Sequence, residues 1–268
     1  PCKAQIQGPP LLPSILYDRT GLREHVDEIE NEPHIAGLQF LGCSKRYGAT
    51  QALSQVTFGV MPGSVVALVG ANGAGKTTLL HALVGLVSLD TGDIQLDGVP
   101  SRSVAAKRRI AFMPDDLPRP VRLTARELVE LTMRLYGCSD VDIDELGARM
   151  DLTGRLDQLL ASYSHGMRRK ADLMAALAVS PDVLVLDEPF SGLDPGMVAQ
   201  LAAILEALRS EGKSVLVSSH DLELVQSIAD HIVLIDCGRV AYQGPCDALL
   251  RQRSSSTLRD AFLDLITQ

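Results

Sequence analysis

The chain has 268 residues, of which 46% are hydrophobic and only 4% aromatic, with no Trp. This length and an aliphatic core favour one large α/β domain, or a compact one with a lobe, over an aromatic-rich β-sandwich. The formal net charge of −8 repels nucleic-acid phosphates, so we expect no nucleic-acid partner.

Three further features limit the class of protein. The five cysteines show no CxxC spacing, which predicts reduced cytosolic thiols in place of a zinc site or a disulfide framework. No apolar run approaches the roughly 18 residues of a membrane span, and prolines interrupt the region where a signal peptide would need an unbroken apolar core. Two basic runs, Lys107–Arg109 and Arg168–Lys170, are predicted to lie on solvated faces.

Residues 1–34 are predicted to be an extension outside the main domain. Their first part is rich in proline, and Leu22, Val26 and Ile29 then fall at helical spacing among charges. This pattern predicts a short amphipathic helix near residues 20–31. It leaves both a flexible leader and a docking element open.

From residue 35 the pattern becomes that of β-strands. A Pro62-Gly63 turn precedes the continuous apolar run Val65–Val69, which leads directly into a glycine-rich loop. The elements predicted in this half are strands at 35–42, 52–60, 65–69, 93–96 and 110–113, and a helix at 77–86.

The second half is mostly helical up to residue 180 and then alternates helices with strands. The aliphatic run Val183–Leu186 suits a buried parallel strand, and Gly238 lies in a predicted hairpin. The predicted helices are 127–136, 166–178, 197–209, 221–229 and 258–265, and the predicted strands are 183–186, 214–217, 232–235 and 240–242.

The glycine-rich loop is the first chemical motif. It reads Gly70-Ala71-Asn72-Gly73-Ala74-Gly75-Lys76-Thr77 and is followed by Thr78. Its glycines let backbone N–H groups converge on a polyphosphate, and the helix that follows adds its positive N-terminal end. The lysine supplies a mobile cation for the terminal phosphates, and the Thr77 hydroxyl is placed for Mg²⁺. The alternative, an ordinary glycine-rich turn, is disfavoured by the strand before the loop and the helix after it.

Two further aliphatic strands end in polar residues. Asp187 and Glu188 follow the run 183–186, where Asp187 is predicted to hold Mg²⁺ and Glu188 to polarise an attacking water. His220 follows the run 215–217 and is predicted to hydrogen-bond a γ-phosphate, since ligands bind at the carboxyl ends of such strands. An acidic pair alone could equally be a helix cap, and a lone histidine is more often structural.

A third motif, Tyr163-Ser164-His165-Gly166-Met167, begins a helical pattern about twenty residues before Asp187. Ser164 and the backbone at Gly166 could form a second helix start that binds an anion, or a simple helix cap.

Together, these motifs resemble the nucleotide-binding subunit of an ABC transporter, over roughly residues 35–265. Gly70–Thr78 resemble its Walker A loop, Val183–Glu188 its Walker B strand, Ser164–Met167 its signature and Ser191–Pro195 its D-loop, which includes Asp194. His220 matches the switch histidine, and Tyr47 matches the aromatic residue that stacks on adenine.

The resemblance implies the fold and the domains. It implies an α/β P-loop NTPase core with a mainly parallel sheet, an antiparallel β subdomain and a helical subdomain. The ATPase domain would span residues 35–246, with a helical lobe at about 118–180, and residues 247–268 would form a helical tail.

The resemblance also implies the activity and the partners. The chain would bind ATP and Mg²⁺ and hydrolyse ATP, with Glu188 and His220 positioning the water. Two such domains would enclose ATP head to tail, so that Ser164 and Gly166 contact the nucleotide held by the other subunit. A multi-span permease would place this chain on the cytoplasmic face of the membrane, as a peripheral subunit.

Two positions depart from the family pattern. Asp115 stands where Gln is usual, and we expect it to act as a weaker Mg²⁺ ligand. The signature keeps Ser164 and Gly166 but has His165 and Met167 where Gly and Gln are usual, which resembles export-type subunits. Export is therefore the favoured direction of transport.

Two alternatives remain. A soluble ABC-type ATPase of translation or DNA repair usually carries two such domains or a long coiled coil, and this chain has neither. A regulatory protein that binds ATP with weak hydrolysis is favoured only by Asp115.

Overall fold

The computed structural model of the chain describes residues 36–115, 120 and 122–267. The extension predicted at residues 1–34, with its helix near 20–31, lies outside these described residues.

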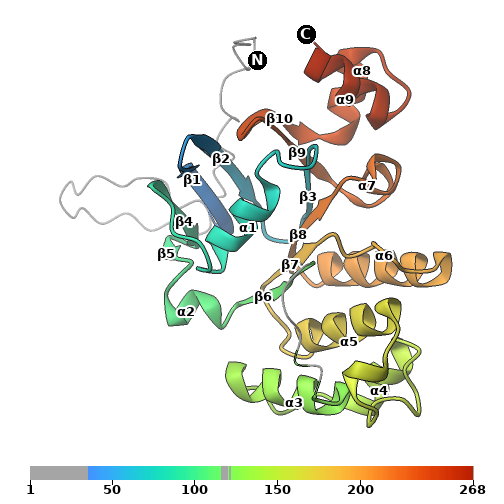
Figure 1. Ribbon diagram of the computed structural model, residues 1–268. Coiled ribbons are helices and arrows are strands. Elements are labelled where there is room, and N and C mark those ends of the chain that lie inside the picture. Colours follow the sequence, from blue (N-terminus) through green and yellow to red (C-terminus); the bar gives the residue numbers. More distant parts are fainter. Residues whose placement is uncertain (1–35, 116–119, 121, 268) are drawn as a thin grey trace, which may run out of the picture.

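The described chain forms two β-sheets (Figure 1). The larger sheet has the order β10-β9-β3-β8-β7-β6, in which only the edge strand β10 is antiparallel to its neighbour. The smaller sheet has the order β2-β1-β4-β5 and is antiparallel. The strands are β1 (Leu38–Tyr47), β2 (Thr50–Val60), β3 (Val65–Val69), β4 (Thr91–Leu96), β5 (Val99–Pro100), β6 (Ile110–Met113), β7 (Val183–Asp187), β8 (Ser214–Ser219), β9 (His231–Asp236) and β10 (Arg239–Pro245). The predicted mainly parallel sheet and the separate antiparallel sheet are confirmed.

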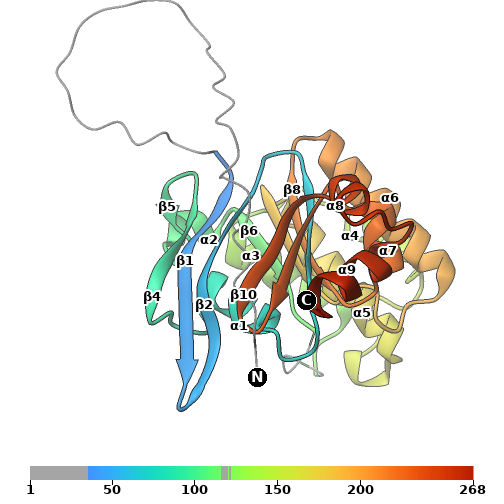
Figure 2. The same cartoon turned by 90° about the horizontal axis from the view of Figure 1, so that it is seen from above.

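The helices lie on both sides of the larger sheet and in a lobe beyond β6 (Figures 1 and 2). They are α1 (Lys76–Leu83), α2 (Val104–Lys107), α3 (Ala125–Tyr136), α4 (Ile143–Arg149), α5 (His165–Leu177), α6 (Pro195–Ser210), α7 (Leu222–Ile228), α8 (Cys246–Arg253) and α9 (Leu258–Thr267). None of the helices among the described residues is long and apolar enough to cross a membrane.

Alternating residues of the parallel strands pack into different hydrophobic cores, because successive side chains of a strand point to opposite faces of the sheet. On β7, Val183 and Val185 pack with α1 and the antiparallel sheet. Leu184 and Leu186 of the same strand pack on the other face, with α3, α5 and α6. The sheet is therefore buried on both faces, which explains why its strands are continuous aliphatic runs.

The helical lobe is built from α3, α4 and α5. Helix α3 begins with a capping box, in which the Thr124 hydroxyl accepts from Glu127 N–H and the Glu127 carboxylate accepts from Thr124 N–H. Helix α5 begins at Ser164, whose hydroxyl accepts from Met167 N–H at 3.2 Å.

Most predicted elements are present, with shifted ends. The first strand runs on to Tyr47, because pairing with β2 continues through its polar residues to a turn at Gly48. The short elements β5, α2 and α4 were not predicted individually, whereas α8 overlaps the helical tail predicted at residues 247–268. Among the described residues, Cys43, Cys138 and Cys246 form no disulfide.

The prediction for the second basic run was wrong. Arg169 and Lys170 are only 1% and 8% exposed. Both lie on the side of α5 that packs against the rest of the molecule, where Arg169 hydrogen-bonds to main-chain carbonyls and Lys170 pairs with Asp151. In the first run, Lys107 is exposed as predicted.

Arg109 joins the two sheets. Its guanidinium lies 2.6 Å from Asp97, which follows β4, and 2.6 Å from Asp182, which precedes β7. The pKa of Asp97 is lowered first by the hydrogen bond from Gly37 N–H and then by Arg109, and the pKa of Asp182 is lowered mainly by Arg109. Both carboxylates therefore stabilise the fold above their ordinary pKa, and this contribution is lost as the pH falls through their lowered values.

We expect Arg109→Met to lower the free energy of unfolding by about 1 kcal/mol at pH 7, because these ion pairs are partly exposed to solvent. Urea unfolding measures the difference from wild type, and this difference should shrink as the pH falls below 3.8, where the carboxyl groups bind protons. Arg108→Met, on an exposed neighbour, is the control. A loss that stays constant with pH would contradict the electrostatic assignment.

Candidate functional site

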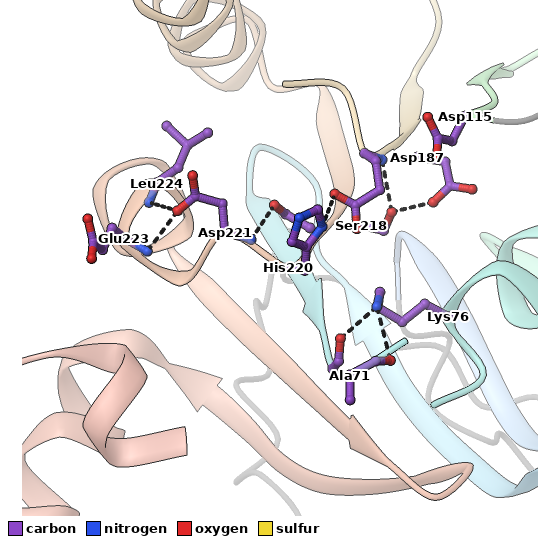
Figure 3. A network of polar contacts seen from close by, with 12 residues as sticks. Ala71, Lys76, Asp115, Asp187, Ser218, His220, Asp221, Glu223 and Leu224 are labelled. Atoms are coloured by element: carbon purple, nitrogen blue, oxygen red, sulfur yellow. Dashed lines mark hydrogen bonds and ion pairs between the residues drawn. The ribbon is translucent and has the colours of Figure 1, made fainter. Parts of the chain in front are cut away.

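The candidate site lies where three neighbouring parallel strands end. Strand β8 pairs with β3 on one side and with β7 on the other. The glycine-rich loop follows β3, Asp187 ends β7, and His220 follows β8. Residues far apart in the sequence are thereby brought to one edge of the sheet (Figure 3).

The glycine-rich loop holds a main-chain path that requires glycine. A Cβ on Gly70 would clash with the carbonyl oxygen of Ile235, and one on Gly75 would lie 2.6 Å from the carbonyl oxygen of Ala52. Gly75 also has a φ of 110°, which side chains rarely allow. Helix α1, which follows, has no side-chain cap, so the N–H groups of its first turn are available to an anion.

Lys76 lies inside this loop and is only 7% exposed. Its ammonium group donates to the carbonyl oxygens of Gly70 at 2.6 Å and Ala71 at 3.4 Å (Figure 3). Burial lowers its pKa, and the nearby Glu188 and Asp187 oppose that shift. A buried cation held by neutral carbonyls, beside open N–H groups, suits a phosphate group.

The remaining predicted loop residues lie as the sequence indicates. Thr77 and Thr78 are in the first turn of α1, with the Thr77 side chain exposed. Between Gly70 and Gly75, Asn72 and Gly73 are exposed and Ala74 is buried.

Asp187 is a buried carboxylate at the end of β7, only 3% exposed. It accepts a hydrogen bond from the Ser218 hydroxyl. Burial raises its pKa, and the carboxylate of Asp115 raises it further, whereas the Ser218 hydrogen bond lowers it. A cation beside this group would remove the cost of keeping it charged.

Glu188 has an unusual main-chain conformation, with a φ of 47°. Its N–H lies 3.1 Å from both the carbonyl and the hydroxyl oxygen of Ser218. Its carboxylate lies 2.9 Å from Nδ1 of His220. Glu188 is mostly buried and His220 is 66% exposed, so the pair has one side toward solvent, from which a water could approach it.

The oxygen donors of the site suit Mg²⁺, which prefers carboxylates, hydroxyls, waters and phosphates. Asp187 and Thr77 supply a buried carboxylate and an accessible hydroxyl. The carboxylate of Asp115 lies 2.9 Å from the guanidinium of Arg169, so an ion pair already engages it. Among the described residues, no cluster of three His, Cys, Asp or Glu forms a complete metal site.

The signature residues lie in another part of the molecule, at the start of α5. A Cβ on Gly166 would lie 3.2 Å from the carbonyl oxygen of Gly192, and a Cβ on Gly192 would clash with the His165 ring. Asp194 caps α6, with its carboxylate accepting from Met197 N–H at 3.1 Å. Within the described residues, no hydrogen bond joins Ser164 or Gly166 to Lys76 or Asp187.

Tyr47 ends β1 and is 48% exposed. The ammonium group of Lys45 lies 5.5 Å from the centre of its ring. An exposed aromatic face of this kind can stack on a planar ring.

Two residues of the site were missed in the sequence. Ser218 bridges Asp187 and Glu188, and its only signal is a polar residue at the end of an aliphatic strand. Arg169 donates to the main-chain carbonyls of Asp187 and Glu188, and its place in a basic run indicated the surface instead.

Comparisons with known proteins give the family and the fold. Residues 53–191 match the family model described as ABC transporter. Daunorubicin resistance ATP-binding protein DrrA3 of Streptomyces coeruleorubidus is 37% identical over 214 residues, which cover 78% of this chain and 68% of that protein. Nod factor export ATP-binding protein I of Burkholderia orbicola is 35% identical, covering 81% and 73%. A solved structure of an ATP-binding subunit of an ABC transporter superposes with a TM-score of 0.81 at 30% identity, covering 86% of this chain and 99% of that one.

We expect Lys76→Ala to weaken the binding of Mg-ATP at least tenfold, about 1.4 kcal/mol. The reason is that the ammonium group is the cation of the glycine-rich loop. Isothermal titration with ATP measures the loss, and Lys107→Ala, an exposed lysine of α2, is the control. Unchanged affinity in Lys76→Ala would contradict the assignment of the loop.

Proposed function

Because the chain belongs to the ABC transporter family, we propose that it is the ATP-binding and ATP-hydrolysing subunit that powers a separate membrane permease, in the direction of export. The observation that carries the hydrolytic part is the meeting of Lys76, Asp187, Glu188 and His220 at adjacent strand ends. The printed names of two relatives speak of drug resistance and of Nod factor export, which favours the outward direction here.

The hydrolytic step follows from the positions of the side chains. Lys76 turns from the loop carbonyls to the phosphates of bound ATP, which also accept hydrogen bonds from the N–H groups of the loop. Glu188 accepts a proton from the attacking water, and His220 hydrogen-bonds the γ-phosphate and orients that water. Mg²⁺, held by Thr77 and Asp187, would offset the charge of the phosphates. Catalysis is then positioning and electrostatics, without a covalent intermediate.

The second subunit follows from the position of the signature. Ser164 and Gly166 lie at the start of α5, and within the described part of the chain no hydrogen bond joins them to Lys76 or Asp187. In a head-to-tail dimer they would meet the ATP held by the partner, and Asp194 would lie at the same interface. The pair could be two copies of this chain or two different chains.

The permease contact is assigned to an exposed apolar groove of about 390 Å³. Its walls come from the end of α1, from α2, from β6 and from α3 (Figure 1). Val104 of α2 and Leu135 of α3 are 71% and 72% exposed. Lys107 and Arg108 also line the groove, so a permease segment with apolar and acidic residues would fit it.

The groove also explains how the permease could reach the catalytic site. Phe112 of β6 lies in its lining, and Asp115 follows the same strand three residues later. We assign the chain to the cytoplasmic face of the membrane, where ATP is present and where this groove would meet the permease. The cargo would be selected by the permease.

We expect Glu188→Gln to lower kcat for ATP hydrolysis at least 100-fold, within the roughly 10²–10⁴ range of general-base catalysis. The variant should still form dimers in the presence of Mg-ATP, because its amide keeps the shape of the side chain. Phosphate release and size-exclusion chromatography measure the two properties, and Glu211→Gln, an exposed residue after α6, is the control. Hydrolysis by Glu188→Gln at the wild-type rate would contradict its role.

We expect Leu135→Asp to abolish co-purification with a multi-span permease from detergent-solubilised membranes, while the ATPase activity of the isolated subunit remains. The charge would be buried in an apolar contact. Met61→Asp, which changes another exposed apolar residue, just beyond β2, is the control and should keep the permease. Recovery of ribosomes in place of a permease with the wild-type chain would contradict the transport proposal.

A further inference from the structure

Arg169 is a buried cation on α5, five residues beyond Ser164 in the sequence. Only 1% of its side chain is exposed, and it is among the largest fully buried side chains of the described residues. Burying a guanidinium is costly unless hydrogen bonds and an opposite charge compensate it. Its partners therefore indicate what the charge does.

Those partners come from two segments outside its own helix. After β6, the guanidinium donates to the carbonyl of Pro114 at 3.2 Å and lies 2.9 Å from the carboxylate of Asp115. At the end of β7, it donates to the carbonyls of Asp187, at 3.0 Å, and Glu188. Its Nε has no partner among the described residues, so the two terminal nitrogens make all of these contacts.

The hydrogen bond from Arg169 stabilises a strained main-chain conformation at Glu188. A left-handed φ of 47° is costly for a residue other than glycine, on the order of 1 kcal/mol. Hydrogen bonds hold this residue on both sides, since its N–H donates to Ser218 and its carbonyl accepts from Arg169. The direction of its carboxylate toward His220, 2.9 Å away, depends on that conformation.

Asp115 supplies the charge that balances Arg169. It is the only carboxylate paired with this guanidinium among the described ion pairs. A neutral side chain at position 115 would remove the carboxylate that pairs directly with this buried cation. Asp115 and Arg169 therefore form one ion pair.

We propose that Arg169 is a positioning residue for Glu188, with Asp115 as its counter-ion. The proposal rests on the proposed function, since it concerns the group that activates water. Arg169 lies on α5, which begins at Ser164. Asp115 follows β6, the strand that contributes to the groove. The ion pair thus ties the signature helix and the β6 end to the main chain of the catalytic carboxylate.

The test is a double-mutant cycle on purified full-length protein. We expect Arg169→Gln to lower kcat for Mg-ATP hydrolysis roughly 10- to 100-fold with KM within about threefold of wild type, because a misplaced base affects the transition state and not ATP binding. Arg169→Lys, which keeps the charge, should retain more activity. Asp115→Asn should lower kcat several-fold, and the double variant Asp115→Asn/Arg169→Gln should lose less than the product of the two single losses.

Lys170→Gln separates positioning from folding. Lys170 is also a buried cation of α5, paired with Asp151, and it makes no contact with Glu188 among the described hydrogen bonds. Thermal unfolding without nucleotide is measured for every variant. Lys170→Gln should lower the unfolding temperature while keeping kcat, and the melting temperatures of the Asp115 and Arg169 variants should also be non-additive.

Four outcomes would overturn the proposal: a kcat for Arg169→Gln within twofold of wild type, a loss that appears in KM, equal loss of kcat in Lys170→Gln, or independent effects of Asp115 and Arg169. If Arg169→Gln does not fold, unchanged kcat in both Asp115→Asn and Arg169→Lys overturns it equally. A wild-type protein without Mg-ATPase activity would instead overturn the proposed function, so the two failures are distinct.

Discussion

The parallel pairing of β8 between β3 and β7 is the constraint on which the site depends. Its register places Ser218 beside Leu68 on one side and beside Asp187 on the other. The carboxyl ends of the three strands consequently coincide, and each one delivers a different chemical group. A slip of this register by one residue would turn the aliphatic side chains of β8 to the wrong faces, so the two cores that require those side chains also hold the site together.

Buried charge is distributed around this edge in a consistent way. Lys76 and Arg169 are cations that the fold keeps from solvent, and Asp187 is the buried anion between them. Each cation is held by main-chain carbonyls, which supply hydrogen bonds without cancelling the charge. In the proposed function a phosphate neutralises Lys76, whereas Arg169 already pairs with Asp115. One cation is therefore available to substrate and the other is structural.

Two exposed surfaces correspond to the two partners in the proposed function. Ser164 lies at the start of α5, where the proposed dimer would place the ATP of the second subunit. The groove between α2 and α3 exposes aliphatic side chains, and it is the surface that we propose for the permease contact. Both surfaces adjoin segments that contact Arg169, which also hydrogen-bonds to the main chain of Glu188. In our proposal, a movement of either surface could therefore shift Glu188 through Arg169.

The sequence by itself determined the elements and the chemistry that lie along one stretch of chain. Glycine spacing, Lys76 and the aliphatic runs before Asp187 and His220 are local patterns, and local patterns specify strands, loops and the groups at their ends. Only the tertiary structure decided that Ser218 bridges Asp187 and Glu188. It also decided that the main chain of Glu188 has a left-handed conformation and that Arg169 is buried. These features depend on which strand lies beside which and on which face of α5 packs inward. A run of basic residues looks the same on either face of a helix, so the burial of Arg169 could be seen only once Asp115 and the end of β7 had been brought against it.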